Sequence, residues 1–268
     1  MANQCSTMPT ALTECLSIEM AASEPWAPDA VLYTPYITEQ ILLADSAQCV
    51  AVQAFLRMCN LEYTVEQRAN AENMSPSGRV PLLRCGKFVI SEFDPIVAFV
   101  TKKGVVLNSL DSKQQADMQA FISLVHNILG NAELYLSWLD GETFETVTAP
   151  RYGSFQPWPL GGVLTWLRRR KMAARLQALQ WADKSLDAVY AEVDTCCRAL
   201  SERLGRETYF FGSQPTPLDA LVYGHLYTII TTPLQDTRLA SIVNGYSNLV
   251  RLTNHVDAEY FKGIEIIG

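Results

Sequence analysis

Residues 80–96, which open with Val80-Pro81, constrain the fold more than any other part of this chain. Two short runs, residues 79–84 and 87–90, read as the strands of a β-hairpin joined at Cys85-Gly86. A helix should follow directly, because Asp94 can cap its first turn and Pro95 suits the first helical position, where a missing N–H is harmless. The segment therefore predicts a hairpin that leads straight into a helix.

The pattern around this hairpin predicts a small α/β domain. Residues 40–44 form a short apolar run that favours a buried parallel strand, and Asp45-Ser46 supplies the chemistry of a helix start. Residues 62–67 alternate like a second strand. The order strand, helix, strand, hairpin and helix predicts a domain over residues 36–104. We expect residues 1–35, which prolines interrupt, to be a partly disordered extension.

The rest of the chain has a helical pattern. Apolar residues recur at helical spacing in three long segments, residues 112–139, 163–180 and 182–204. Thr216-Pro217-Leu218-Asp219 has the pattern of a capping box that opens a further helix. We therefore expect an all-helical domain over residues 105–262 and a short tail over residues 263–268. The predicted fold class is α+β, with a separate core in each domain.

Charge and hydropathy narrow the possible partners. The net charge of −7 at pH 7 argues against a general affinity of the whole chain for nucleic acid or anionic lipid. No basic residue precedes Arg57, so we expect neither an Arg-rich mitochondrial presequence nor a secretory signal that begins with positive charge. No apolar run approaches the roughly 20 residues that a membrane-spanning helix needs.

The cysteines and histidines do not form a recognisable chemical motif. The seven cysteines are odd in number and lack CxxC spacing, which favours reduced thiols, and Cys196-Cys197 is interpreted as a pair of buried, inert thiols. His126, His225 and His255 lie far apart in the sequence without partners at helical spacing. We therefore interpret them as hydrogen-bonded structural residues, and we expect neither a metal site nor a cofactor.

From about Ile41 to Phe261 the layout resembles the glutathione-transferase fold, a thioredoxin-like domain followed by an all-helical one. Two local signatures carry the resemblance. The first is Val80-Pro81 before the hairpin, where the proline of that fold is cis. The second is Tyr209-Phe210-Phe211-Gly212 leading into Thr216 and Asp219, which resembles the capping box of its C-terminal domain.

Within that fold the sequence more closely resembles the metaxin family, on its metaxin-2 branch. The motifs that carry this resemblance are spread over both halves of the chain: Ala51-Val52-Gln53-Ala54-Phe55-Leu56, Arg68-Ala69-Asn70-Ala71-Glu72, Met74-Ser75-Pro76-Ser77-Gly78-Arg79-Val80-Pro81, Ala132-Glu133-Leu134-Tyr135-Leu136, Arg151-Tyr152-Gly153-Ser154, Pro157-Trp158-Pro159-Leu160, and Leu218-Asp219-Ala220-Leu221-Val222-Tyr223-Gly224-His225-Leu226-Tyr227-Thr228-Ile229.

This resemblance implies a non-enzymatic protein, bound peripherally to the cytosolic side of the mitochondrial outer membrane. It implies that the protein forms a heterodimer with a membrane-anchored partner metaxin. It also implies that the two act with the β-barrel assembly machinery in protein import. It also implies a role as an adaptor for mitochondrial transport on microtubules, with a kinesin adaptor and a mitochondrial Rho GTPase as partners. It implies neither a nucleic-acid partner nor a cofactor.

The alternative is a soluble glutathione transferase that uses Ser46, which lies three residues before Cys49, as in some enzymes of that fold. We favour the simpler interpretation that Ser46 or Asp45 only caps a helix. Where a glutathione binder carries a serine after the glutamate, this chain has Phe93, so a hydroxyl donor is missing. Asp94 would also repel the ligand's carboxylate at the helix start.

The cluster Trp166, Arg168, Arg169, Arg170 and Lys171 is the strongest basic feature of the sequence. It is a candidate for contact with anionic lipid headgroups or with an acidic partner. We favour a solvated helix face, because runs of charge are usually hydrated. Trp158, between two prolines, is interpreted either as an anchor that holds a loop on the helical core or as a residue of a subunit interface.

Overall fold

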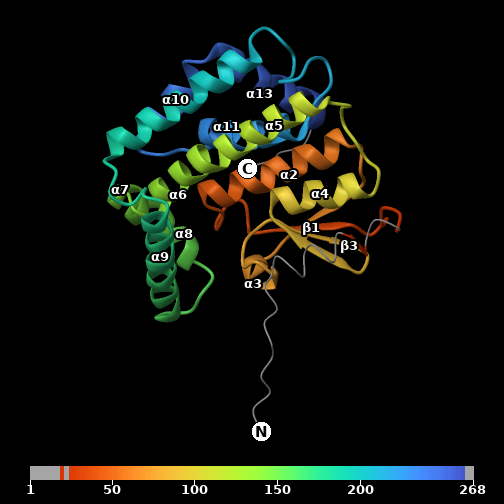
Figure 1. Cartoon of the computed structure of the whole chain (residues 1–268). Helices are drawn as coiled ribbons and strands as arrows, with labels where there is room; N and C mark the ends of the chain where they lie inside the picture. Colours follow the sequence, from red (N-terminus) through yellow and green to blue (C-terminus); the bar gives the residue numbers. More distant parts are fainter. Residues whose placement is uncertain (1–18, 21–23, 263–268) are drawn as a thin grey trace.

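The computed structural model describes residues 19–20 and 24–262, so most of the predicted extension and the predicted tail over residues 263–268 lie outside the described residues. Within the described part, one four-stranded sheet packs against a thick layer of helices (Figure 1). The predicted α+β class is confirmed, with the strands in the first half of the chain and helices throughout the second.

The sheet has the strand order β2-β1-β3-β4. Strand β1 (Val31–Thr34) pairs in parallel with β2 (Thr64–Gln67) and antiparallel with β3 (Leu82–Cys85). Strand β3 pairs antiparallel with β4 (Phe88–Ser91), which confirms the predicted hairpin. Its turn contains Gly86 with φ of +60°, a backbone conformation that glycine adopts without steric cost.

The segments on either side of the hairpin are partly as predicted. The Val80–Pro81 peptide bond is cis, as the resemblance implied. Helix α4 (Phe93–Lys102) begins earlier than expected: its N-cap is Glu92, with φ of +69° and no side-chain cap bond. The prediction that Asp94 caps this helix is therefore wrong, because Asp94 lies within the first turn. At the other end Gly104, with φ of +82°, follows the helix as predicted.

The first strand is not where the sequence pattern placed it. The prediction of a strand over residues 40–44 is wrong, because those residues lead into helix α2 (Leu43–Met58). The first strand is β1, which lies inside the segment expected to be an extension. The apolar run is buried as the start of a helix, and the true strand spans only four residues, too few for a clear alternating pattern.

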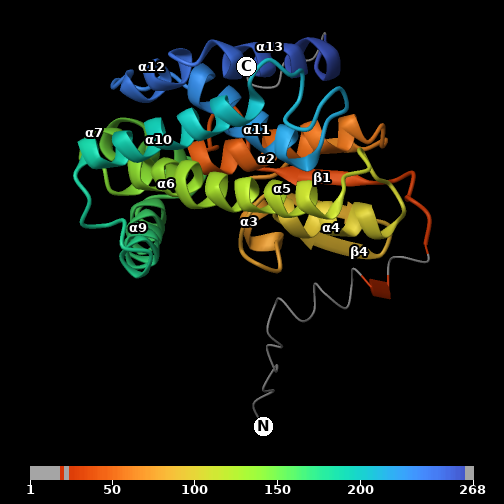
Figure 2. The ribbon, with the colours of Figure 1, turned by 45° about the horizontal axis from the view of Figure 1, so that its top comes forward.

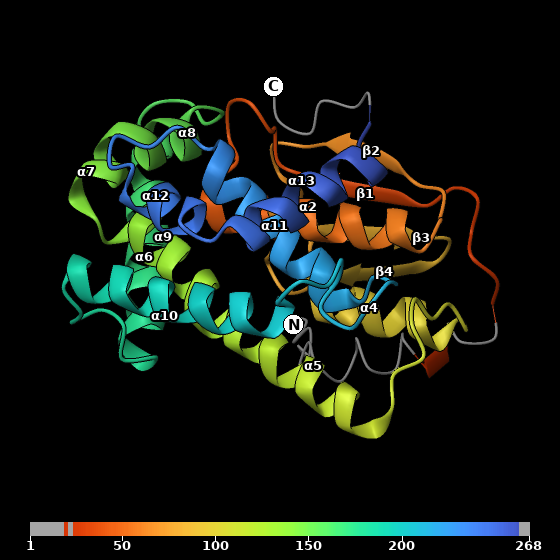
Figure 3. The same ribbon diagram turned by 90° about the horizontal axis from the view of Figure 1, so that it is seen from above.

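Helix α2 lies at the centre of the molecule, between the sheet and helix α11 (Pro217–Thr231) (Figures 1 and 3). The two helices approach so closely that a Cβ atom added at Gly224 would lie 2.4 Å from the carbonyl oxygen of Ala47 and 2.6 Å from Cβ of Ala51. Glycine is therefore required at this crossing, and α2 is apolar on nearly all sides because neighbours cover it on each.

The capping box at the start of α11 is confirmed and is fully buried. Asp219 accepts hydrogen bonds of 2.8 Å from the backbone N–H groups of Thr216 and Phe210, so it ties the helix start to the preceding turn. Burial raises the pKa of Asp219 to about 6, against the opposing effect of these hydrogen bonds.

The second half of the chain forms the helical layer, which Figure 2 shows from a tilted view. The long helix predicted over residues 112–139 is one continuous run in which α5, η1 and α6 follow one another without a break. The remaining helical bounds are α3 (Ala71–Met74), α5 (Ser112–Val125), η1 (His126–Gly130), α6 (Asn131–Trp138), α7 (Gly141–Thr143), η2 (Phe144–Thr148), α8 (Ala149–Gly153), α9 (Leu160–Ala178), α10 (Leu186–Leu204), α12 (Arg238–Asn244) and α13 (Ser247–Tyr260).

The expectation of two separate cores is wrong. One apolar core runs without interruption from Leu32 in the sheet, through Phe55 of α2 and Leu221 of α11, to Val256 of α13. The physical reason is the crossing of α2 and α11, which share buried residues across the junction between the two halves. The two halves are therefore packed as one body.

Helices α8 and α9 project from this body and remain joined to it: Leu176 of α9 lies in the core, Met172 packs on Trp138, and Arg151 of α8 donates to the carbonyl oxygen of Ile41. In Figure 1 they extend from one end of the helical layer, and the loop that joins them lies at the free end, where α9 begins. Their mutual contact uses small residues: a Cβ added at Gly161 would lie 2.8 Å from the carbonyl oxygen of Gly153. We call residues 149–178 the α8–α9 arm.

Candidate functional site

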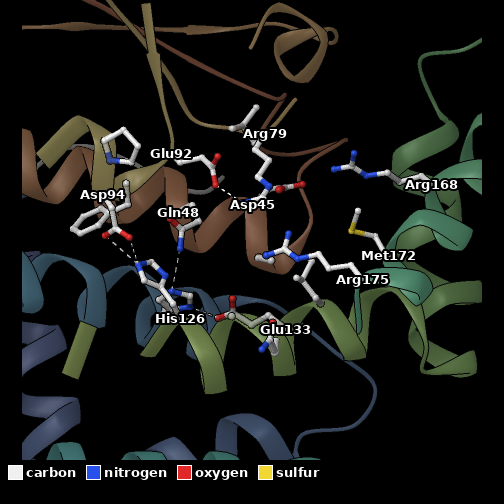
Figure 4. A pocket seen from close by; sticks show the side chains of 18 residues that line it. Asp45, Gln48, Arg79, Glu92, Asp94, His126, Glu133, Arg168, Met172 and Arg175 are labelled. Atoms are coloured by element: carbon white, nitrogen blue, oxygen red, sulfur yellow. Dashed lines mark hydrogen bonds and ion pairs between the residues drawn. The ribbon is translucent and has the colours of Figure 1, made fainter. Parts of the chain in front are cut away.

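A cleft of about 340 Å³ lies between the sheet half and the helical half. Figure 4 shows that its side chains come from α2, from the loop before β3, from the start of α4, and from α6 and α9. The cleft is rich in charge, and both acidic and basic side chains line it. This composition makes the cleft the candidate functional site.

The residues at the start of α4 leave little room for a ligand carboxylate. Phe93 is 1% exposed, with its ring 6.1 Å from the ring of Phe55 and 6.5 Å from that of His126, measured between centroids. Asp94 lies 3.2 Å from Nε2 of His126, and Glu92 forms an ion pair of 2.5 Å with Arg79. The amino end of this helix is therefore surrounded by the protein's own carboxylates and by a core aromatic ring.

Two of the arginines that line the cleft, Arg79 and Arg168, form ion pairs with acids of the same chain. Arg168 pairs with Glu72, and both side chains are largely buried. Burial raises the pKa of Asp45, and Arg168, Arg175 and Arg79 act in the opposite direction. Burial also lowers the pKa of Arg175, and the nearby Arg79 lowers it further. The cleft thus holds acidic and basic side chains close together, and two acid–arginine pairs among them are direct ion pairs.

Below this network lies a buried chain of hydrogen bonds that the sequence did not reveal. Nδ1 of His225 is 2.8 Å from Oε1 of Glu133, and the Gln48 amide lies 3.3 Å from Nε2 of the same ring. Glu133 and His225 are fully buried, and burial raises the pKa of Glu133. No sequence pattern joins two residues 92 positions apart. The presence of a glutamate on an otherwise apolar helical face is nevertheless a sequence feature that could have indicated a buried acid.

The three histidines all have hydrogen-bond partners, as their interpretation as structural residues predicted. His225 bonds to Glu133, His126 to Asp94, and Nε2 of His255 lies 3.2 Å from the Tyr209 hydroxyl. Within residues 19–20 and 24–262, no group of three or more His, Cys, Asp or Glu residues is placed to hold a metal ion.

Ser46 is placed away from the cleft. It lies inside α2 and is 3% exposed, with the hydroxyl of Thr228 donating to it over 3.4 Å. It lines a different cavity of about 370 Å³, whereas Asp45 and Gln48 face the cleft. The interpretation of Ser46 or Asp45 as a helix cap is wrong, because α2 begins at Leu43 and its N-cap, Leu42, makes no side-chain cap bond.

The cysteines in the described part of the chain are free, and most are buried. Burial raises the pKa of Cys196 well above its usual range and that of Cys197 to about 12, which fits their interpretation as inert thiols. Burial and the nearby Asp45 also raise the pKa of Cys49. Cys5 and Cys15 lie outside the described residues.

The predicted basic cluster on α9 is divided between two environments. Arg168 faces Glu72, and Arg169 donates to the carbonyl oxygen of Trp138 over 3.0 Å with its guanidinium 3.8 Å from the centre of the Phe144 ring. Arg170 and Lys171 are exposed, and the guanidinium of Arg170 lies 5.0 Å from the ring centre of Trp166. Only part of the cluster is therefore available to a partner.

Comparison with known proteins places the chain in a family. It is 49% identical to Metaxin-2 of Mus musculus over 94% of this chain and 96% of that protein, and 48% identical to Metaxin-2 of Homo sapiens over the same shares. This chain belongs to the metaxin family. Metaxin-1 of Mus musculus is 31% identical over 79% of this chain and 69% of that protein, so this metaxin lies on the metaxin-2 branch.

Two family models match successive parts of this metaxin. Residues 49–169 match Tom37, described as an outer mitochondrial membrane transport complex protein, and residues 193–256 match a glutathione S-transferase C-terminal domain. Members of this family are therefore proteins of an outer mitochondrial membrane transport complex. Among the residues that the structure describes, none of the helices is both long enough and apolar enough to cross a membrane.

Solved structures share the fold at low sequence identity. The β-etherase LigF from Sphingobium sp. strain SYK-6 superposes with a TM-score of 0.55 and 15% identity, covering 86% of this metaxin and 95% of that chain. A glutathione S-transferase III in its apo form gives 0.50 and 16% identity, covering 86% and 92%. The predicted glutathione-transferase-like fold is confirmed, and at such identities the likeness concerns the fold alone.

Proposed function

We propose that this metaxin is a non-enzymatic subunit on the cytosolic side of the mitochondrial outer membrane. It acts with a membrane-anchored partner metaxin, as a heterodimer, in protein import and in the assembly of β-barrel proteins, and its own attachment is peripheral. The proposal draws on the family match, because the family is described as part of a transport complex and a complex requires contacts between subunits.

The observation that carries the proposal is the state of the cleft at the start of α4. A glutathione binder needs hydrogen-bond donors there for the ligand's carboxylate. In this metaxin Glu92 and Asp94 carry carboxylates to that end, and Phe93 is packed into the core. The loss of one charged hydrogen bond alone weakens affinity by roughly tenfold or more. These features favour a fold kept for binding a protein.

The position of Ser46 counts against the rival function of a glutathione transferase. A serine that stabilises a thiolate must point its hydroxyl into the ligand cleft. Ser46 is buried against Thr228 and lines a cavity on another side of α2. Asp45 and Gln48 of the same helix face the cleft instead, and a carboxylate beside a thiolate would raise its pKa.

Thermal melting with millimolar glutathione separates these two functions. A ligand that binds only the folded state raises the melting temperature in a saturable way. We expect no saturable shift for this metaxin, while a glutathione transferase measured in parallel shows one. Saturable stabilisation, together with conjugating activity that Ser46→Ala abolishes, would overturn the non-enzymatic proposal.

Affinity capture from detergent-solubilised mitochondria tests the partners. We expect the tagged chain to recover a partner metaxin and components of the β-barrel assembly machinery, identified by mass spectrometry. The transport role predicts in addition a kinesin adaptor and a mitochondrial Rho GTPase in the captured set. Recovery of the import partners without the motor components would restrict the function to import.

A further inference from the structure

We propose that the α8–α9 arm is a membrane-contacting element, with its free end inserting into the headgroup region of an anionic bilayer. This inference rests on the membrane location in the proposed function and extends it by naming the surface that meets lipid. It concerns the free end of the arm around Trp158, whereas the sequence pattern singled out only the basic cluster further along α9.

The free end of the arm exposes large apolar side chains that the fold leaves uncovered. Trp158 is 94% exposed, so its interpretation as an anchor that holds the loop on the helical core is wrong. Its neighbours on the first two turns of α9 add to the patch: Leu160 is 44% exposed, Val163 50%, Trp166 53% and Leu167 50%, whereas Phe155 on the loop stacks on Tyr36 of the body. A cluster of this kind marks an interaction surface.

The sequence of the arm is depleted in acids, which gives the patch one sign of charge. The whole chain has 28 acidic residues against 21 basic ones, yet none of those acids lies between Glu145 and Asp183. Three of the six cations in that interval are used internally: Arg151 donates to the carbonyl oxygen of Ile41, Arg168 pairs with Glu72, and Arg169 donates to the carbonyl oxygen of Trp138. A fourth, Arg175, lines the cleft. Arg170 and Lys171 remain at the surface.

The spacing along α9 suits the layers of a bilayer surface. At about 1.5 Å per residue, Trp166 lies about 9 Å and Arg170 about 15 Å along the axis from Leu160. Interfacial elements bury their apolar residues roughly 5–10 Å into the boundary between headgroups and acyl chains. With the free end at that depth, the Trp166 ring reaches the interface, where tryptophan is favoured, and Arg170 reaches the anionic headgroups.

A groove of about 520 Å³ beside the patch adds to this argument. Trp158 and Trp166 line it, and Gly153, Gly161 and Gly162 contribute to it where side chains are absent. The groove is therefore shaped by aromatic rings and by bare backbone, with the Arg169 side chain at its edge. Such a groove suits the flexible methylene chain of a lipid, and Arg169, the charged residue that lines it, favours an anionic headgroup over an uncharged one.

Co-sedimentation with vesicles tests the inference on the full chain. The vesicles contain either phosphatidylcholine alone or phosphatidylcholine with phosphatidylserine. We expect binding to the anionic vesicles that weakens with salt. Trp158→Ala should weaken it about tenfold, because a large apolar side chain no longer leaves water. Arg170→Gln with Lys171→Gln should weaken it roughly 25-fold, at about fivefold per cation.

Matched variants elsewhere on the surface serve as controls. Val106→Ala removes another exposed apolar side chain, and Lys87→Gln with Arg206→Gln removes two other exposed cations; these should bind vesicles like the parent chain. Brominated lipids should quench the tryptophan fluorescence of the parent chain and quench that of Trp158→Phe much less. Urea unfolding of each variant confirms that the fold is retained.

Three results would overturn the inference. The first is that the arm variants bind anionic vesicles as well as the control variants do. The second is equal binding to the two kinds of vesicle. The third is that the arm variants bind vesicles like the parent chain but no longer recover the partner metaxin in affinity capture. That result would show that the arm contacts a protein. Loss of vesicle binding with intact partner capture supports the inference. Failure of partner capture in the parent chain would instead count against the proposed function.

Discussion

The crossing of α2 with α11 and the α8–α9 arm both rely on small residues, and they use them for opposite purposes. At the crossing, Gly224 lets two helices meet backbone to backbone in the middle of the core. In the arm, Gly161 lets α9 meet α8, but large apolar side chains near that contact, such as Trp158 and Trp166, are exposed. The first region determines whether the chain folds, and the second is free to carry a function.

The charges differ between these regions in the same way. Around α2 and α11, ionisable side chains are buried and hydrogen-bonded, as in the pair of Glu133 with His225 and the capping box of Asp219. On the arm, Arg170 and Lys171 are exposed and have no acid in their own stretch of sequence. A buried matched network contributes to the fold, while an exposed set of one sign is available to a partner.

The largest effect should come from Gly224→Ala. The added Cβ would lie 2.4 Å from a backbone oxygen, which cannot move without displacing α2. We expect the free energy of unfolding to fall by about 3 kcal/mol or more, measured by urea denaturation. Gly162→Ala is the matched control, because it lies in helix α9 in open space and should leave stability unchanged or raise it by about 0.5–1 kcal/mol. Equal effects at the two glycines would refute the close crossing.

The second effect is a pH dependence that arises from Asp219. Its pKa is raised from 3.8 to about 6, so the folded state binds the proton more tightly than the unfolded state does. Its contribution to stability is therefore present at pH 4 and is lost as the pH rises through about 6. At about 1.4 kcal/mol for each pKa unit, the loss approaches about 3 kcal/mol.

The variant Asp219→Asn isolates this contribution, because asparagine does not titrate. The parent chain and the variant are unfolded in urea at intervals between pH 4 and pH 7. We expect the difference between their free energies of unfolding to shrink as the pH rises across that window. A difference that stays constant would show that Asp219 does not titrate between these limits.

The parts of the fold that the sequence predicted are those with local causes. The hairpin has a glycine turn, and the start of α11 has its capping residues within four positions. A four-residue strand such as β1 has no comparable local signal, so the pattern assigned the nearest apolar run instead. That run is buried because α2 begins there, which depends on how distant segments pack.

The candidate site was predictable only in part, for the same reason. The loss of a hydroxyl at Phe93 is visible in the sequence, because a single position carries it. The position of Ser46 depends on the direction of a side chain around α2, and the pairing of Glu133 with His225 depends on packing between two helices. The exposure of Trp158 depends on how α8 and α9 project from the body, which no local pattern records.

A third prediction divides the basic cluster by burial. Arg168→Met removes the partner of Glu72, whose carboxylate would remain largely buried, so we expect a loss of about 1–3 kcal/mol in the free energy of unfolding. Arg170→Met acts on a residue whose guanidinium stacks on Trp166 at the surface, and we expect a change within about 0.5 kcal/mol. The free energy of unfolding of both variants is measured by urea denaturation at neutral pH. Similar losses of stability in the two variants would show that the cluster is a single structural unit.

The smallest effect on stability is expected when Trp158 is truncated. A small effect would show that this side chain does not pack in the folded protein. A tryptophan in a core would cost about 3–5 kcal/mol when truncated to alanine. Trp158 is 94% exposed, so Trp158→Ala should change the free energy of unfolding by no more than about 0.5 kcal/mol. Trp181, which is 5% exposed, is the matched control and should show the full core penalty as Trp181→Ala. A large loss at Trp158 would mean that the Trp158 side chain packs on the body in solution, and the arm would then lack the exposed apolar end that it offers to a membrane.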